Sequence, residues 1–129
     1  MIKNSKILIA GGGTGGHLFP AFAIGSRLEK EGAKVTYIGS IYGIEKNYKN
    51  ELKDKLYLLN ITGIDRTISV KSFLNHLMFP FRFVISYLKS IIIIKRINPK
   101  IIIGTGGYSS GLPLLAGIFL NVKSVIHEQ

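Results

Sequence analysis

Five glycines, a threonine and a histidine follow the first apolar run of the chain. The run Ile7–Ala10 leads directly into Gly-Gly-Gly-Thr-Gly-Gly-His at residues 11–17, and an amphipathic stretch comes next. Glycines let a backbone approach a ligand closely with its N–H groups exposed. The N-terminus of the following helix favours negative charge at the same place. The pattern therefore predicts a site for a phosphate or diphosphate group.

Two nucleotide motifs resemble this first loop, and neither fits it well. The glycine spacing satisfies the dinucleotide pattern G-x-G-x-x-G, but that site also needs a carboxylate after the second strand. Here the second strand ends in Ile38-Gly39-Ser40, which contains no carboxylate, so NAD is disfavoured as a ligand. A P-loop needs a lysine where His17 stands. The alternative that these glycines only allow the strand to pack closely on the helix remains open. Thr14 and His17, however, add polar groups that packing does not require.

A second glycine-rich loop follows another apolar run. Ile101–Ile103 precedes Gly104-Thr105-Gly106-Gly107-Tyr108, and we expect a helix from near Pro113. A third polar segment, His127-Glu128-Gln129, follows the last expected strand. The carboxyl ends of parallel strands meet at one edge of a sheet, so all three segments should face one crevice. This convergence favours a ligand site, whereas His127 alone would suggest a packed core histidine.

Apolar runs and amphipathic stretches alternate along the chain, which indicates βαβ units. Strands are predicted at 6–10, 34–38, 56–61, 100–103 and 124–126. Helices are predicted at 18–31, 43–52, 71–79, 81–95 and 113–120, with Pro80 separating two of them. Residues 62–70 are the best candidate for an irregular loop. Short Ile/Val/Leu strands are typical of a Rossmann-like, doubly wound, mainly parallel α/β sheet, and 129 residues fit one such domain.

Composition narrows the class of partner. The chain has 17 Lys+Arg against 7 Asp+Glu, a net charge of +10, which favours anionic partners. The basic residues form no dense run interleaved with aromatics, so a nucleic-acid partner is disfavoured. There is no cysteine and hence no disulfide frame. No secretory leader is visible before the first strand, so we expect a cytoplasmic location.

The stretch 71–83 is dense in large apolar and aromatic side chains with basic residues beside them. It predicts a peripheral membrane patch made of Lys71, Phe73, Leu77, Phe79, Arg82, Phe83 and Lys89. Ordinary core packing or a dimer contact is the alternative. A spanning helix is not expected, because 83–94 is short and Lys89 interrupts it.

The second of the two helices predicted in this region has an apolar face of its own. Helical spacing assigns to that face Phe81, Val84, Ile85, Leu88, Ile91 and Ile92, which we expect to pack on the sheet. Phe83 and Tyr87 fall off this face.

Several motifs together resemble the N-terminal half of the MurG family, bacterial glycosyltransferases that add N-acetylglucosamine to lipid I. They are residues 11–17, Phe19-Pro20-Ala21, residues 104–108 and residues 127–129. The motifs keep the family's order and approximate spacing, and the match is loose between about 40 and 98. Leu112 departs from the family, in which proline usually follows the glycine of this loop directly.

The resemblance implies a GT-B fold, with two Rossmann-like domains around a cleft and this chain as the acceptor-binding one. It implies an inverting transfer from UDP-GlcNAc to undecaprenyl-pyrophosphoryl-MurNAc-pentapeptide (lipid I), giving lipid II at the cytoplasmic face of the bacterial inner membrane. His17 is the expected general base, and His127 and Glu128 are alternatives. We expect substrate contacts from Gly13, Thr14, Gly15, Gly16, Thr105, Gly106, Gly107, Tyr108 and Gln129. No metal or other cofactor is expected from this half.

Two other functions fit the sequence. One is a non-catalytic, membrane-recruiting subunit of a split UDP-GlcNAc transferase, which a neighbouring gene for the other half would indicate. The other is a stand-alone nucleotide-binding Rossmann module, which would bind NAD or a nucleotide by itself. The sequence stops at Gln129, where the family continues into a donor-binding domain, so no transfer is expected from these residues alone.

Overall fold

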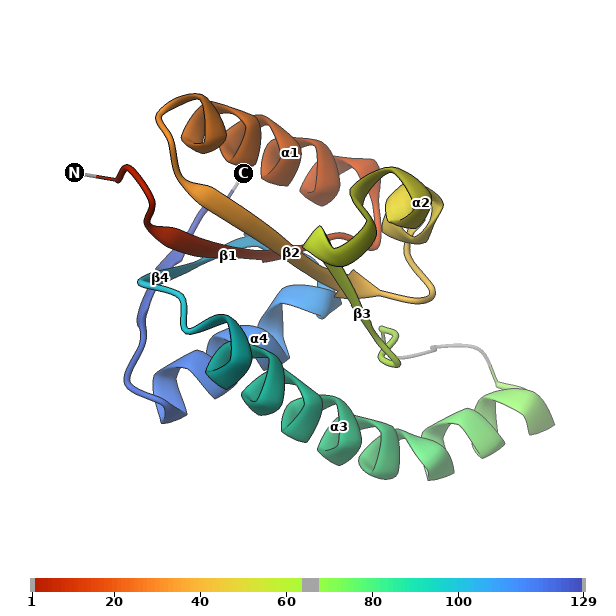
Figure 1. Ribbon diagram of the computed structural model, residues 1–129. Helices are drawn as coiled ribbons and strands as arrows, with labels where there is room; N and C mark the ends of the chain where they lie inside the picture. The colour runs from red at the N-terminus through yellow and green to blue at the C-terminus, as the bar shows by residue number, and fades with distance from the viewer. Residues whose placement is uncertain (1, 64–67, 129) are drawn as a thin grey trace.

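A computed structural model of the chain describes residues 2–63 and 68–128 (Figure 1). Its five strands form one sheet in the order β3-β2-β1-β4-β5, and every neighbouring pair is parallel. The strands are β1 (Lys6–Gly11), β2 (Lys34–Ser40), β3 (Leu56–Leu59), β4 (Ile101–Gly106) and β5 (Lys123–Ile126). This order is that of a doubly wound Rossmann-like domain, so the predicted fold class is confirmed.

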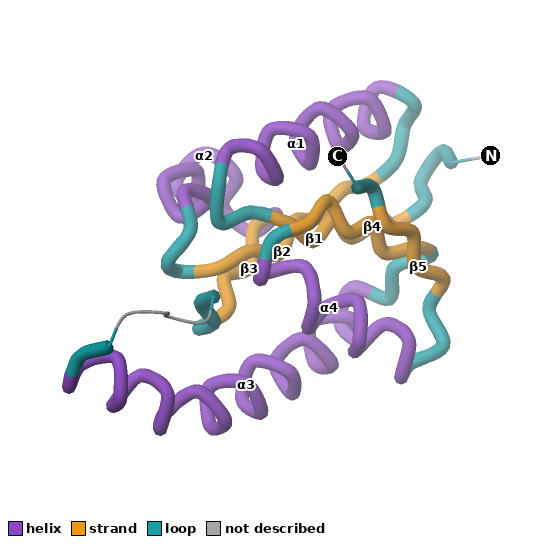
Figure 2. Tube along the Cα trace, turned by 180° about the vertical axis from the view of Figure 1, so that it is seen from behind, coloured by secondary structure: helices purple, strands orange, loops and turns teal. Residues whose placement is uncertain are grey.

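Helices cover both faces of the sheet (Figures 1 and 2). They are α1 (Gly15–Lys30), α2 (Lys49–Leu52), α3 (Val70–Ile97) and α4 (Tyr108–Phe119), and 3₁₀ turns occupy Ile44–Tyr48 and Lys53–Lys55. α1 and α2 lie on one face, and α3 and α4 lie on the other. Of the expected irregular loop at 62–70, residues 64–67 lie outside the described residues, and α3 already begins at Val70.

The core sits on both sides of β1. Ile7 and Ile9 pack toward α1, in a cluster that includes Ala21. Leu8 and Ala10 pack in the other cluster, with residues of α3 and α4. Because both faces of the strand are covered, β1 reads as an uninterrupted apolar run in the sequence.

The two central strands place two loops side by side. β1 and β4 are neighbours, and Gly11 pairs with Gly106 where both strands end. The chain leaves β1 for α1 on one face of the sheet and leaves β4 for α4 on the other. Such a divergence opens a crevice at the carboxyl ends of the strands, where doubly wound domains bind ligands.

α3 runs through Pro80 as one helix, so the predicted break is wrong. Proline removes one backbone hydrogen bond and costs roughly 3 kcal/mol inside a helix. Pro80 is exposed, so water can reach the carbonyl that loses its partner. Ser69 caps the start of the helix by accepting from the Ser72 N–H at 3.0 Å, and the other end is built into the core. The helix curves gently in Figure 2.

Helices α1 and α4 begin earlier than predicted. α1 starts at Gly15, and α4 starts at Tyr108 with Pro113 inside it. The glycine-rich turn before α4 ends at Gly107, whose φ of 81° lies in the left-handed region, and helical geometry follows at once. Residues assigned to glycine loops therefore form the first turns of the two helices.

The apolar face of α3 that was predicted to pack on the sheet is instead exposed, apart from half-buried Ile91. Exposure reaches 65% for Phe81, 51% for Leu88 and 63% for Ile92. The buried face carries Ser86, Ser90, Ile93 and Ile94, and Tyr87 packs on the core. Both faces are apolar, so helical spacing alone assigned the wrong one.

Small polar residues identify the face of α3 that packs on the domain. The Ser86 hydroxyl donates to the Asn60 carbonyl at 3.1 Å, and the Ser90 hydroxyl donates to the Ser86 carbonyl at 2.9 Å. α3 has 28 residues and contains an 18-residue window with a mean hydropathy of 1.8, so it is long and apolar enough to cross a membrane by length and composition. The helix is thus longer than the segment 83–94 on which the expectation of no spanning helix was based, and its C-terminal half is packed into the domain.

Candidate functional site

The two glycine loops are in direct contact. A Cβ at Gly107 would overlap the Gly12 carbonyl oxygen, and a Cβ at Gly106 would lie 2.6 Å from Cδ2 of His17. Both glycines also have positive φ values, 103° for Gly106 and 81° for Gly107. Only glycine fits these two positions, because a side chain would push the loops apart.

His17 is held by both loops. It lies in the first turn of α1, where its Nδ1 is 3.1 Å from the Thr14 hydroxyl oxygen. Its carbonyl accepts a 2.8 Å hydrogen bond from the hydroxyl of Thr105 in β4. The imidazole is half-buried against the second loop, which restricts its orientation.

The three segments that the sequence places at one sheet edge line a common pocket of about 430 Å³. Its lining comprises His17, Thr105, Gly106, Gly107, Ile126, His127 and Glu128. The backbone N–H of His127 donates to the Gly104 carbonyl at 2.7 Å, which fixes the last segment beside the second loop. His127 and Glu128 are exposed, so neither belongs to the core. Gln129 lies outside the described residues.

Two helices begin at this edge of the sheet. Within the described part of the chain, neither the Thr14 N-cap of α1 nor the Gly107 N-cap of α4 supplies a side-chain hydrogen bond to its first turn. N–H groups of an uncapped first turn, at the positive end of the helix dipole, suit a phosphate group. Across residues 2–63 and 68–128, no group of three or more His, Cys, Asp or Glu side chains could hold a metal ion.

A buried carboxylate that sequence reasoning missed supports the first loop. Glu45 has no exposed surface, and its Oε2 accepts the Gly13 N–H at 2.9 Å. Its Oε1 accepts the Ser40 N–H at 2.6 Å. A Cβ at any of three glycines would overlap its side chain; these are Gly12, Gly39 and Gly43. A glutamate that follows two closely spaced glycines after a strand was the available signal.

Two predicted substrate contacts are engaged within the protein. Gly13 gives its N–H to Glu45, and Thr105 is 2% exposed with its hydroxyl bonded to His17. The structure thus places both residues where they hold the loops. Contacts from Gly13 and Thr105 to a ligand stay predictions.

Tyr108 joins the second loop to the first. Its ring would lie 2.9 Å from a Cβ at Gly13 and 3.4 Å from a Cβ at Gly63, so it fills the space between these two glycines. Burial raises the pKa of the Tyr108 phenol, the Glu45 charge raises it further, and a hydrogen bond with Ser40 partly opposes them. The phenol therefore stays protonated at neutral pH and can donate a hydrogen bond.

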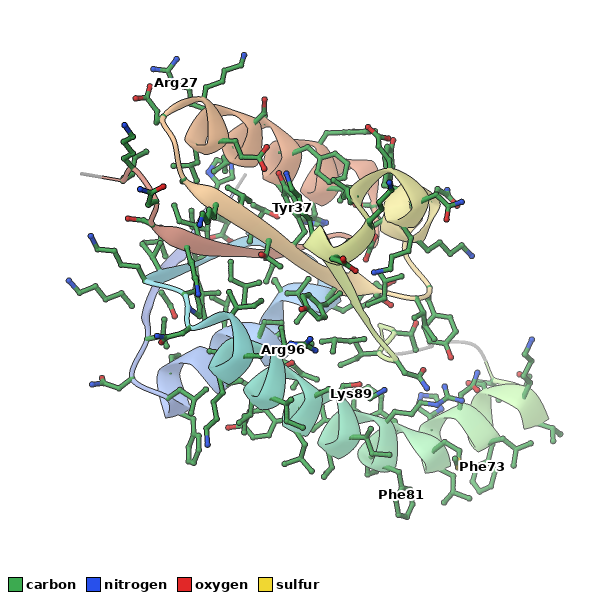
Figure 3. All side chains as sticks on the ribbon, in the orientation of Figure 1. Arg27, Tyr37, Phe73, Phe81, Lys89 and Arg96 are labelled. Carbon is green, nitrogen blue, oxygen red and sulfur yellow. The ribbon has the colours of Figure 1, made fainter. Side chains whose placement is uncertain are left out.

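The predicted membrane patch divides between two sides of α3. Phe73 and Leu77 are exposed, whereas Phe79 is half-buried and its ring lies 6.0 Å from that of Phe83. Figure 3 shows Phe73 and Phe81 extending away from the sheet. We call the exposed apolar side of α3 the outer stripe: Phe73, Leu74, Leu77, Phe81, Val84, Ile85, Leu88 and Ile92. By helical spacing, Lys71, Arg82, Lys89 and Arg96 form a basic row beside it.

The doubly wound Rossmann-like fold of this chain is shared by two crystal structures of glycosyltransferases. One is Acinetobacter baumannii MurG, with a TM-score of 0.74 and 24% identity, over 96% of this chain and 35% of that one. The other is the Streptomyces sp. SF2575 glycosyltransferase SsfS6, with a TM-score of 0.62 and 14% identity, over 97% of this chain and 39% of that one. At these identities the likeness concerns the fold. The chain belongs to glycosyltransferase family 28, whose N-terminal domain matches residues 7–129.

Curated relatives in this family share one name, "UDP-N-acetylglucosamine--N-acetylmuramyl-(pentapeptide) pyrophosphoryl-undecaprenol N-acetylglucosamine transferase". The relative from Prosthecochloris aestuarii is 40% identical over 96% of this chain and 34% of its own length. The relative from Rickettsia typhi is 40% identical over 96% of this chain and 30% of its own length. The chain thus spans about one third of the length of these relatives.

Proposed function

We propose that this chain is the acceptor-binding part of an enzyme that transfers N-acetylglucosamine from UDP-GlcNAc to undecaprenyl-pyrophosphoryl-MurNAc-pentapeptide, forming lipid II. The names of its relatives support the reaction. One structural observation supports the acceptor role above all others. The first turns of α1 and α4 and the imidazole of His17 meet at one edge of the sheet, beside a single pocket.

The acceptor carries a diphosphate, which the site would hold through the backbone. The N–H groups of Gly15 and Gly16 begin α1, and those of Tyr108 and Ser109 begin α4. Two helix dipoles then point their positive ends at the same anion. The net charge of +10 adds a favourable long-range potential for an anionic substrate.

The chemical step needs a base close to the attacking sugar hydroxyl, and His17 has the best position for it. Thr14 and the second loop fix the orientation of its imidazole, and imidazole is the most frequent general base in enzymes. The acceptor oxygen forms a bond to the anomeric carbon of N-acetylglucosamine as the bond to UDP breaks, with inversion. The hydroxyl proton passes to the imidazole. Glu128 and His127, which line the same pocket, are the alternative bases.

The donor would contact this chain at Thr14, Gly15 and Gly16 and would be held mainly by a further part of the enzyme. The outer stripe of α3 would enter the interface of an anionic membrane, with the basic row at its headgroups. The protein would then be peripheral, at the cytoplasmic face of the inner membrane. The packed C-terminal half of α3 keeps the domain at the surface.

An NMR titration of the ¹⁵N-labelled chain tests the acceptor site. The ligand is a water-soluble, short-chain analogue of lipid I, and the control is the same sugar-peptide with a monophosphate in place of the diphosphate. We expect the diphosphate analogue to shift the amides of Gly15, Gly16, Tyr108 and Ser109 most strongly. Equal responses to both analogues, or shifts confined to other regions, would contradict the proposal.

A further inference from the structure

A second, apolar pocket lies beside the candidate site. It has a volume of about 200 Å³ and is formed by the loop after β3, the inner side of α3 and the first turns of α4. Ile61, Phe79, Phe83, Leu112 and Leu115 are the large apolar side chains of its wall, and none of the described residues that line it is charged. The pocket is smaller than the roughly 300–1,000 Å³ typical of sites that enclose a whole small molecule, so it suits one segment of a ligand.

This pocket adjoins the proposed diphosphate site, because two consecutive residues line one pocket and the other. Gly107 lines the larger pocket beside His17, and Tyr108 lines the apolar one. The Tyr108 ring also lies against Gly13 of the first loop. On its other side the apolar pocket is bounded by Phe79 and Phe83, which belong to the helix that carries the outer stripe.

We infer that the apolar pocket binds the first isoprene units of the acceptor lipid, those attached directly to the diphosphate. This inference rests on the proposed function, because it takes the diphosphate to lie at the starts of α1 and α4. A prenyl diphosphate has an uncharged hydrocarbon chain bonded to its anionic group, and the protein has an uncharged pocket next to uncapped helix N-termini. The remainder of the lipid would continue toward the outer stripe and the membrane.

Gly111 offers a way to fill the pocket without disturbing the fold. It lines the pocket, and a Cβ built there meets no heavy atom within 4 Å. Gly111 lies inside α4, where a residue other than glycine is favoured by helix propensity. Gly111→Leu should therefore occupy the space, and Gly111→Ala is the matched control that gains helix propensity with little added volume.

The probes are methyl diphosphate and geranyl diphosphate, two monoesters of diphosphate with chains of one and ten carbons. Binding to the labelled chain is followed by NMR below the micelle-forming concentration. We expect geranyl diphosphate to bind about tenfold more tightly or better, because about two buried methylene groups already account for that factor. Gly111→Leu should abolish the affinity advantage of geranyl diphosphate over methyl diphosphate and leave the affinity for methyl diphosphate unchanged. Gly111→Ala should keep most of this advantage.

A second pair of variants covers the case in which the Gly111→Leu variant fails to fold. Leu115 and Ile118 are both exposed residues of α4, and only Leu115 lines the pocket. Leu115→Lys should reduce the gain from the ten-carbon chain, and Ile118→Lys should not.

The outcomes separate the two proposals. If both diphosphates shift the glycine-loop amides with equal affinity, the lipid pocket is overturned and the diphosphate site stands. The lipid pocket is also overturned if Gly111→Leu keeps the gain, or if Ile118→Lys removes it as fully as Leu115→Lys. If neither diphosphate affects the loops, the proposed function itself fails.

Discussion

The hydroxyl of Thr105 donates a 2.8 Å hydrogen bond to the carbonyl of His17, joining two segments that are 88 residues apart in the chain. Thr105 is almost fully buried, and Gly11 lies against it where a Cβ would overlap the hydroxyl. The end of β4 is therefore fastened to the first turn of α1. The two glycine loops behave as one unit because this contact and the backbone packing at Gly107 connect them.

Removing the Thr105 hydroxyl should loosen that unit. Thr105→Val keeps the shape of the side chain, loses the hydrogen bond to His17, and should lower the free energy of unfolding by about 1 kcal/mol. Urea denaturation measures the loss, and amide shifts should change in both loops. Thr105→Ser retains the donor and should keep those shifts close to the original. Shift changes confined to β4 would show that the bond does not couple the loops.

Glu45 should control the shape of the first loop. In Glu45→Gln the amide can accept at only one atom, so a buried N–H of Gly13 or Ser40 loses its partner, at a cost of about 2 kcal/mol. We expect lower stability in urea and faster hydrogen exchange at Gly13. Glu51→Gln, an equal change of charge at an exposed position of α2, should alter neither. Unchanged exchange at Gly13 in Glu45→Gln would contradict this role.

His17 should matter for turnover more than for acceptor binding. In a preparation that performs the transfer, His17→Gln should lower kcat by about 10²–10⁴-fold, the usual contribution of a general base, with little change in acceptor KM. The rate of UDP release measures this effect. Thr14→Val, which removes the hydroxyl 3.1 Å from the ring, should have a smaller effect of the same kind. Near-normal turnover in His17→Gln would transfer the role to Glu128 or His127.

The outer stripe of α3, rather than its inner aromatics, should determine membrane binding. Phe81→Ser with Leu88→Ser alters two exposed side chains and should weaken binding to vesicles of phosphatidylcholine and phosphatidylglycerol by about tenfold or more. The urea midpoint should stay nearly unchanged. Phe79→Ser with Phe83→Ser alters the pair that lines the inner pocket and should mainly lower stability. The reverse pattern of effects would reject this assignment of faces.

Tyr37 should make stability fall at alkaline pH. Burial raises its pKa to about 12, and the charge of Glu29 contributes. The phenol in the unfolded chain ionises near pH 10, so the stability linked to it is complete below that pH and lost as pH rises toward 12. Relative to Tyr37→Phe, the original protein should lose about 1 kcal/mol between pH 9 and pH 11, as measured in urea. Parallel pH profiles for the two proteins would rule this out.

The sheet was predictable from sequence because its central strands are buried on both faces. Ile7–Ala10 and Ile101–Ile103 read as continuous apolar runs. Each run is followed by two glycines with positive φ, which are Gly12 and Gly13 in the first loop and Gly106 and Gly107 in the second. The meeting of His17, the second loop and His127 followed from the rule that parallel strands end at one edge. These inferences depend on local pattern and topology, which the sequence carries directly.

The orientation of α3 was not predictable, because both of its faces are apolar. Phe81 and Leu88 satisfy helical spacing as well as the inner residues do, and only tertiary contacts reveal that Ser86 and Ser90 pack against the domain.

The role of Glu45 could not be predicted from the sequence for a related reason. An acidic residue is usually solvated, and the burial of Glu45 depends on glycines from two separate segments of the chain.

The glycines around Glu45 have a consequence for how this sequence can change over time. Gly39 and Gly43 leave no space for a methyl group while the glutamate is present, although neither has a positive φ. A lineage that replaced Glu45 with a small residue would be free to acquire alanine at both positions, whereas Gly12, with φ of 148°, would remain fixed by its backbone. Positions 39, 43 and 45 should therefore co-vary among descendants of this protein.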